Sequence, residues 1–214
     1  MVGPGRPARS LVLIALLVVC SLGAYTGVHA IHQLGRAEAA GFAGLFQYPA
    51  WSAAHFVAGV VFSLLVPFQL SASIRRRHPA AHRWSGRVAL ATSLPLGVTG
   101  IALPYAMPAR PLSERLFMTA VAAAFLTCAL RALLAARARD FARHRAWMLR
   151  TVALGFAPMT QRLVFPLLVG AAGGIADVAS FWPLFTAAAG AGVAANLGLV
   201  QWWLAVTRRA PPPR

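Results

Sequence analysis

Six apolar stretches, each about 20 residues long, constrain this chain more than any other feature. A stretch of that length crosses a bilayer as an α-helix, because a helix satisfies its backbone polar groups internally. We predict spanning helices over residues 11–31, 51–71, 88–106, 116–135, 149–170 and 182–206. The linkers are short, so the sequence predicts an all-α polytopic bundle forming one membrane domain over 1–214, with a short cytoplasmic tail at 207–214.

Composition agrees with a chain that lies in lipid. Hydrophobic residues make up 59% of the sequence and charged residues only 11%, whereas a soluble domain carries about 25% charged residues. The two cysteines lie in separate apolar stretches without a CxxC spacing, which favours a packing role over a metal site.

The basic residues are distributed unevenly along the chain. All 20 are arginines, and the formal net charge is +16. Cytoplasmic loops of membrane proteins carry an excess of basic residues. Fifteen arginines fall on one predicted side: Arg6, Arg9, Arg75, Arg76, Arg77, Arg83, Arg87, Arg137, Arg139, Arg143, Arg145, Arg150, Arg208, Arg209 and Arg214. Only Arg36, Arg110 and Arg115 fall on the other, so we predict that both termini are cytoplasmic.

The uneven distribution of the arginines also indicates what the protein binds. We expect the basic loops to meet the bilayer and its anionic lipid headgroups rather than nucleic acid. One alternative concerns the N-terminus, because Arg6, Arg9, an apolar core and the triplet Val28-His29-Ala30 are also compatible with a signal peptide cleaved after Ala30. Cleavage would leave five helices with the same orientation. Oligomeric state is left open.

Two polar side chains inside the predicted spans need partners. Arg162 lies 13 residues after Leu149, about 20 Å into its helix, where an unpaired arginine is costly. Its partner is expected to be Glu114 or Asp177, backbone carbonyls, or the acidic group of a ligand. His144 shares a face with Arg162 if the helix is continuous through Pro158.

Side-chain spacing predicts two helix faces. His55, Phe62 and Gln69 recur every seven residues, which places them on one face that we expect to be directed inward. In the last predicted helix, Gly190, Ala194 and Gly198 form a small-residue face suited to close packing against another helix.

The histidines fall into two groups, one near each membrane surface. His29 and His55 lie near the outer surface, and His82 and His144 near the cytoplasmic one. Neutral imidazoles from two helices can ligate the iron of a b-type haem, so these four residues are candidate haem ligands. The alternative is that each is an interfacial residue that only makes hydrogen bonds. The sequence identifies no other metal site.

Several of these residues belong to longer motifs. The runs are Pro67-Phe68-Gln69, His82-Arg83-Trp84-Ser85-Gly86-Arg87 and His144-Arg145-Ala146-Trp147-Met148-Leu149-Arg150. With His55 and Arg162, they resemble a bacterial family of predicted membrane proteins, domain-of-unknown-function family 2306, over about Phe42 to Pro166. Ala89 stands where members often carry an aromatic residue. The resemblance implies a multi-helix protein of the bacterial inner membrane in which His55, His82, His144 and Arg162 belong to a shared pattern.

Three functional hypotheses follow. The most specific is a haem- or quinone-linked electron-transfer protein that uses the four histidines, with arginines neutralising haem propionates. The second is a small transporter or channel-like protein with Arg162 in an anion or proton pathway. The third is a non-catalytic membrane subunit. The sequence has no hydrolase triad, metalloprotease helix or phosphate-binding glycine loop, and so does not predict an enzyme.

Overall fold

The structure is a computed structural model that describes residues 21, 25, 28–29, 47–107 and 110–208. Within these residues the chain is helical and has no strand. The elements are α3 (Pro49–Leu70), α4 (Ala72–Arg77), α5 (Pro79–Ala102), the 3-10 helix η2 (Leu103–Ala106), α6 (Leu112–Arg137), α7 (Phe141–Gly155), α8 (Ala157–Ala171) and α9 (Val178–Arg208).

Five stretches of the described chain are long and apolar enough to cross a membrane. They correspond to the second through sixth predicted helices, and the all-α bundle is confirmed. The predicted helix over residues 11–31 lies outside the described residues, apart from Ser21, Tyr25, Val28 and His29, which are helical. The proposed signal-peptide cleavage falls in the same region and stays a prediction.

Several helix boundaries differ from the predicted ones by a few residues, including the start of α7 at Phe141 rather than at 149, and proline explains two of the differences. Helix α5 begins at Pro79 rather than at residue 88, because a proline in the first turn has no N–H that would need a partner. The predicted helix over 149–170 is two helices that meet at Phe156. Pro158, in the first turn of α8, has no N–H to donate to the carbonyl four residues earlier. His144 and Arg162 therefore lie on separate helices, and the continuous face does not form.

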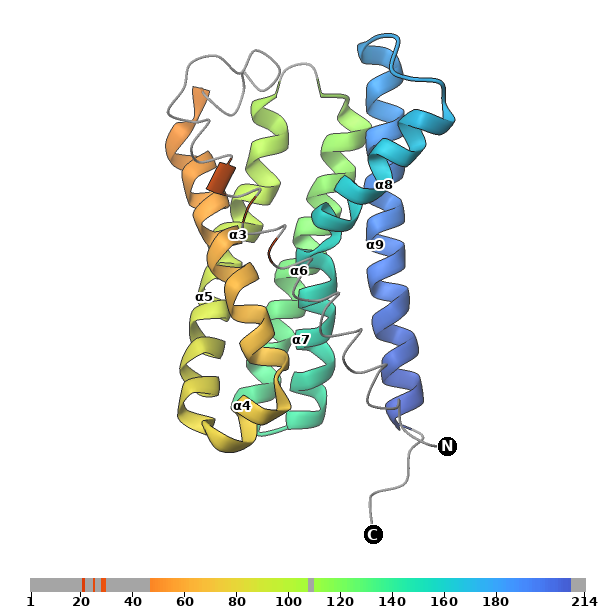
Figure 1. The fold of residues 1–214 in the computed structure, drawn as a ribbon. Coiled ribbons are helices and arrows are strands. Elements are labelled where there is room, and N and C mark those ends of the chain that lie inside the picture. The colour runs from red at the N-terminus through yellow and green to blue at the C-terminus, as the bar shows by residue number, and fades with distance from the viewer. Residues whose placement is uncertain (1–20, 22–24, 26–27, 30–46, 108–109, 209–214) are drawn as a thin grey trace.

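The helices pack as antiparallel neighbours. Helix α3 lies along α5, α6 along α7, and α8 along α9. Figure 1 shows α4, the α6–α7 turn and the end of α9 together at one end of the bundle. We call this the basic end, since nine exposed arginines lie there: Arg75, Arg76, Arg77, Arg83, Arg87, Arg137, Arg139, Arg143 and Arg145. The start of α3 and the α5–α6 and α8–α9 connections lie at the opposite end. That the basic end faces the cytoplasm stays a prediction.

The buried core joins α3, α6 and the α7–α8 junction. It contains Phe62, Val66, Phe125, Cys128, Leu154 and Phe156, and the Phe62 side chain is only 2% exposed. Phe62 is the middle residue of the predicted inward face of α3, and that face is confirmed. Cys128 is a free, buried thiol within this core, as its apolar context predicted, whereas Cys20 lies outside the described residues.

Among the described residues, helix α9 meets α8 through Gly192, which is not one of the predicted small-face residues. Nothing described lies within 4 Å of a Cβ built at Gly190 or Gly198. A Cβ at Gly192 would lie 2.7 Å from the Ala157 carbonyl oxygen and 3.1 Å from the Gln161 nitrogen. Gly192 is therefore the glycine that lets α9 approach the backbone of α8. Close packing on the predicted face of Gly190, Ala194 and Gly198 stays a prediction, because no described residue lies near the two glycines.

Candidate functional site

Gln69, near the end of α3, holds the first turns of α5 in place. Its Nε2 donates to the His82 carbonyl at 3.1 Å and to the Ser85 hydroxyl at 2.6 Å. The Ser85 hydroxyl in turn donates to the Ala81 carbonyl. A Cβ at Gly86 would come within 2.9 Å of the Gln69 Oε1, so the glycine of this motif gives the amide its space. The inward orientation predicted for Gln69 is observed.

His82 and His144, which begin the motifs over 82–87 and 144–150, lie in the first turns of α5 and α7, at the basic end. His144 places its Nδ1 2.9 Å from the Ala132 carbonyl oxygen of α6. A carbonyl only accepts, so Nδ1 carries a proton, and in the neutral ring Nε2 keeps its lone pair. The Nδ1 of His82 is buried without a hydrogen-bond partner in the described part of the chain. The charges of Arg75 and His144 both act on the His82 ring.

The motif over residues 144–150 places two arginines next to an aromatic ring. Trp147 of α7 lies between the guanidinium groups of Arg131 and Arg150, whose Cζ atoms are 4.9 Å and 4.7 Å from its ring centroid. Arg150 also donates to the Gln201 side chain of α9 at 3.0 Å. Cation–π contacts of this kind let arginines remain charged at the membrane edge while their side chains pack. This arrangement joins α6, α7 and α9 beside His144.

His55 lies in the half of the bundle nearer the opposite end. Its Nδ1 is 2.8 Å from the Thr99 hydroxyl of α5, and that hydroxyl donates to the Pro95 carbonyl. A hydroxyl has one proton, so the ring nitrogen is the donor to Thr99 and Nε2 is an acceptor. His55 and His144 thus both use the Nδ1–H as a donor, but they lie far apart along the bundle.

Arg162 lies on the exposed side of α8. Its Nη1 donates to the Pro158 carbonyl at 2.9 Å, and its charge acts on His55. Neither predicted acidic partner is used. Glu114 pairs with Arg110, and Asp177 accepts from the Ser180 backbone N–H at the start of α9. Of the partners expected from the sequence, the backbone carbonyl is the one observed.

His29 belongs to the part of the chain that is described only at a few positions. Its ring stacks on Tyr25 with centroids 6.0 Å apart, and it is exposed. The pairing of His29 with His55 stays a prediction. Among the described residues, no group of three or more histidine, cysteine or acidic side chains could hold a metal ion. A haem needs only two protein ligands, so that finding does not test the haem hypothesis.

Sequence reasoning missed a buried ion pair at the opposite end. Glu114, fully buried in the first turn of α6, lies 3.0 Å and 2.9 Å from the Arg110 Nη1 through its two oxygens. Arg110 also lies over the rings of Trp182 and Phe185. Burial lowers the pKa of the Arg110 guanidinium, while the charge of Glu114 raises it. No clear sequence signal marked this pair, because Arg110 precedes α6 and the helical i, i+4 rule applies only to residues within one helix.

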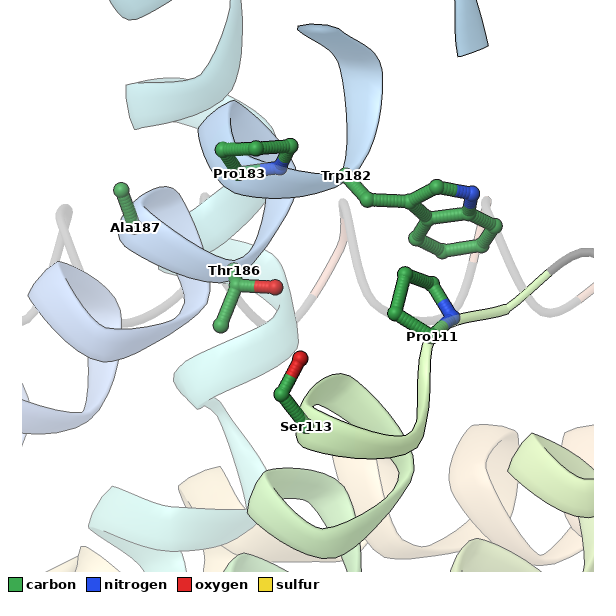
Figure 2. A pocket seen from close by; sticks show the side chains of 6 residues that line it. All are labelled: Pro111, Ser113, Trp182, Pro183, Thr186 and Ala187. Carbon is green, nitrogen blue, oxygen red and sulfur yellow. The ribbon is translucent and has the colours of Figure 1, made fainter. Parts of the chain in front are cut away.

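A pocket of about 370 Å³ opens beside this pair between α6 and α9. Trp182 and two prolines form most of its wall, and Figure 2 shows the Ser113 and Thr186 hydroxyls turned toward the space between them. The lining residues are Pro111, Ser113, Trp182, Pro183, Thr186 and Ala187. The lining is uncharged and holds none of the predicted site residues.

The fold defines an α-helical membrane protein with several spanning helices. The model of the family described as predicted membrane protein (DUF2306) matches residues 52–204, and the chain belongs to that family. No curated protein and no solved structure matches the chain. The resemblance found in the sequence motifs is therefore confirmed, and the matched region overlaps every described spanning helix.

Proposed function

We propose that this protein is a membrane electron-transfer protein that binds a b-type haem at the basic end through His82 and His144. The observation that carries the proposal is the state of these two histidines. They come from different helices, interact electrostatically and keep ring nitrogens without hydrogen-bond partners among the described residues.

The donor set fits a haem. Metal-ligating histidines usually donate their second ring N–H to a carbonyl or carboxylate, which fixes the tautomer and the ring orientation. The bond from His144 to the Ala132 carbonyl is of that kind and leaves Nε2 available. His82 has an unpartnered buried Nδ1, and an unpaired buried nitrogen is unfavourable unless a ligand occupies it.

Neighbouring residues support the same assignment. Gln69 bonds the His82 carbonyl, so the backbone that carries the ring is held against α3. Arg75, beside His82, supplies positive charge for a propionate. A bound haem would supply a one-electron couple, and the protein's part is to hold it between two neutral imidazoles.

The experiment is a reduced-minus-oxidised visible spectrum of the full chain, purified in mild detergent after expression with haem supplied. We expect a sharp α band and one haem per chain from this site. His82→Ala and His144→Ala should each remove that pigment. His78→Ala is the matched control, because His78 is an exposed histidine between α4 and α5 at the same end.

Stoichiometry separates one site from two. If His29 and His55 also ligate a haem, the wild type holds two haems and His55→Ala removes only one. Helical circular dichroism and a single elution peak must show that each variant is folded. A folded, colourless wild type would overturn the proposal, as would a pigment that both His82→Ala and His144→Ala retain.

A further inference from the structure

Two arginines from different helices meet at the ring of Trp147. The guanidinium carbon of Arg131, from α6, is 4.9 Å from the ring centroid, and that of Arg150, from α7, is 4.7 Å from it. The two guanidinium carbons can therefore be no farther apart than the sum of these distances. We call Arg131, Trp147 and Arg150 the Trp147 clamp, because contacts to one ring hold two positive charges close together.

The described chain supplies no carboxylate to this clamp. Asp140, at the α6–α7 turn, pairs with Arg143. Glu114, in the first turn of α6, and Asp177, just before α9, lie at the opposite end of the bundle (Figure 1). Two like charges held this close repel each other, so an anion that contacts both of them is stabilising. The clamp therefore suits an anion that is not part of the described protein.

The two guanidinium groups keep hydrogen-bond donors for such an anion. A guanidinium has five N–H donors, and a cation–π contact is an attraction between charge and ring that needs none of them. Arg131 is exposed and makes no hydrogen bond with a described residue. Arg150 uses two donors, one on the Ala146 carbonyl and one on the Gln201 side chain of α9. The planar fork of N–H groups that remains matches the oxygens of a phosphate.

The depth of the clamp in the membrane identifies the source of that phosphate. Helix α6 has 26 residues and is about 39 Å long, whereas the hydrocarbon layer is about 30 Å thick. Arg131 lies six residues before the end of α6 at Arg137, which corresponds to about 9 Å along the helix. Tryptophan rings such as that of Trp147 prefer the headgroup region. The clamp thus lies at the level of the lipid phosphates in the leaflet at the basic end.

We propose that the Trp147 clamp binds the headgroup of one anionic phospholipid, whose phosphate oxygens accept from Arg131 and Arg150. Basic sites between membrane helices recognise anionic headgroups in this way. Phosphatidylcholine is disfavoured, because its choline cation is repelled by the two arginines. This is a site for a single lipid, in addition to the general attraction expected of the basic end. It uses neither His82 nor His144, so it stands or fails independently of the haem proposal.

The test measures the melting temperature of the full chain in phosphatidylcholine nanodiscs that contain increasing fractions of phosphatidylglycerol. A ligand that binds only the folded state raises its stability, so we expect the melting temperature to rise and then saturate. A second arm keeps the bilayer as phosphatidylcholine alone and adds inorganic phosphate to the buffer, with ionic strength matched by sodium chloride. We expect no rise there, because free phosphate has no acyl chains to hold it at the level of the clamp.

Variants distinguish the clamp from the general attraction of the basic end. Arg131→Gln should weaken the apparent affinity for phosphatidylglycerol about tenfold or more, because it removes a charge-assisted partner of the phosphate. Arg137→Gln is the matched control, since it removes the same charge from an exposed position on the same helix, and it should weaken binding by about twofold at most. Arg131→Lys keeps the charge without the planar fork and should bind with intermediate affinity, which also keeps the test decisive if Arg131→Gln does not fold.

Three results would overturn the proposal. The first is a wild type that phosphatidylglycerol does not stabilise beyond phosphatidylcholine. The second is an equal loss of affinity in the Arg131 and Arg137 variants, which would assign the effect to the charge of the basic end as a whole. The third is equal stabilisation by inorganic phosphate, which would identify a soluble anion as the ligand.

Discussion

The two ends of the bundle handle charge in opposite ways. At the basic end nine arginines are exposed, and Asp140 pairs with Arg143 through side chains that are 38% and 80% exposed. At the opposite end the ion pair of Glu114 with Arg110 is almost completely buried, with side chains 1% and 10% exposed. Aromatic rings cover the Arg110 guanidinium there, whereas water reaches most of the arginines at the basic end.

The difference shows where charge contributes to the fold and where it contributes to placement. An exposed ion pair contributes little, because water screens it. Removing one partner of a buried pair is costly, because an uncompensated charge remains in an apolar environment. The opposite end thus depends on its few charges for stability. The arginines of the basic end are predicted to set orientation and to meet anionic lipid headgroups. Hydrogen bonds from the neutral Gln69 side chain join α3 to α5 there.

The largest effect is expected from breaking the buried pair. Glu114→Gln leaves Arg110 buried without a counter-charge, and we expect a loss of about 3–5 kcal/mol in the free energy of unfolding in detergent. Arg110→Met combined with Glu114→Leu should recover most of the loss. Asp140→Asn is the control at the basic end and should change stability by no more than about 0.5 kcal/mol. Equal effects of Glu114→Gln and Asp140→Asn would erase the contrast between the ends.

A smaller effect is expected from Gln69 at the basic end. Gln69→Leu removes two hydrogen bonds between α3 and α5 and leaves the His82 carbonyl without this donor, which should cost about 1–3 kcal/mol. The free energy of unfolding is the measurement. Gln201→Leu, at an exposed glutamine that bonds only Arg150 among the described residues, should be close to neutral. A neutral Gln69→Leu would show that the basic end is held by packing alone.

The smallest effect concerns pH at the start of α9. Hydrogen bonds from the Ser180 backbone lower the pKa of Asp177 below its ordinary value of 3.8. A depressed pKa means that the ionised form stabilises the fold above pH 3.8, and that this contribution is lost as the pH falls through the lowered pKa. Melting temperatures of the wild type and Asp177→Asn should therefore converge in acid. A difference that is constant across pH would contradict this role.

Much of the site was visible in the sequence because its residues stand in motifs with helical spacing. His55, Phe62 and Gln69 repeat every seven residues, and the structure places all three toward other helices. The hydrogen-bond partners of His55, Gln69 and His144 were not visible in the sequence. Thr99, Ser85 and the Ala132 carbonyl lie 12 or more residues away along the chain, and nothing in a single sequence marks which helix faces which.

The sequence by itself determined that this is a helical membrane bundle, where most of its spanning segments lie and which of its loops are basic. Segment length and charge placement are sufficient for that, because the bilayer imposes both. Tertiary structure alone decided that Gly192 rather than Gly190 meets α8, that the α7–α8 break separates His144 from Arg162, and that Glu114 pairs with Arg110. These helices are apolar on nearly every face, since lipid and protein interior are equally apolar. The rotation of each helix is consequently set by the fit of its neighbours and not by its own pattern.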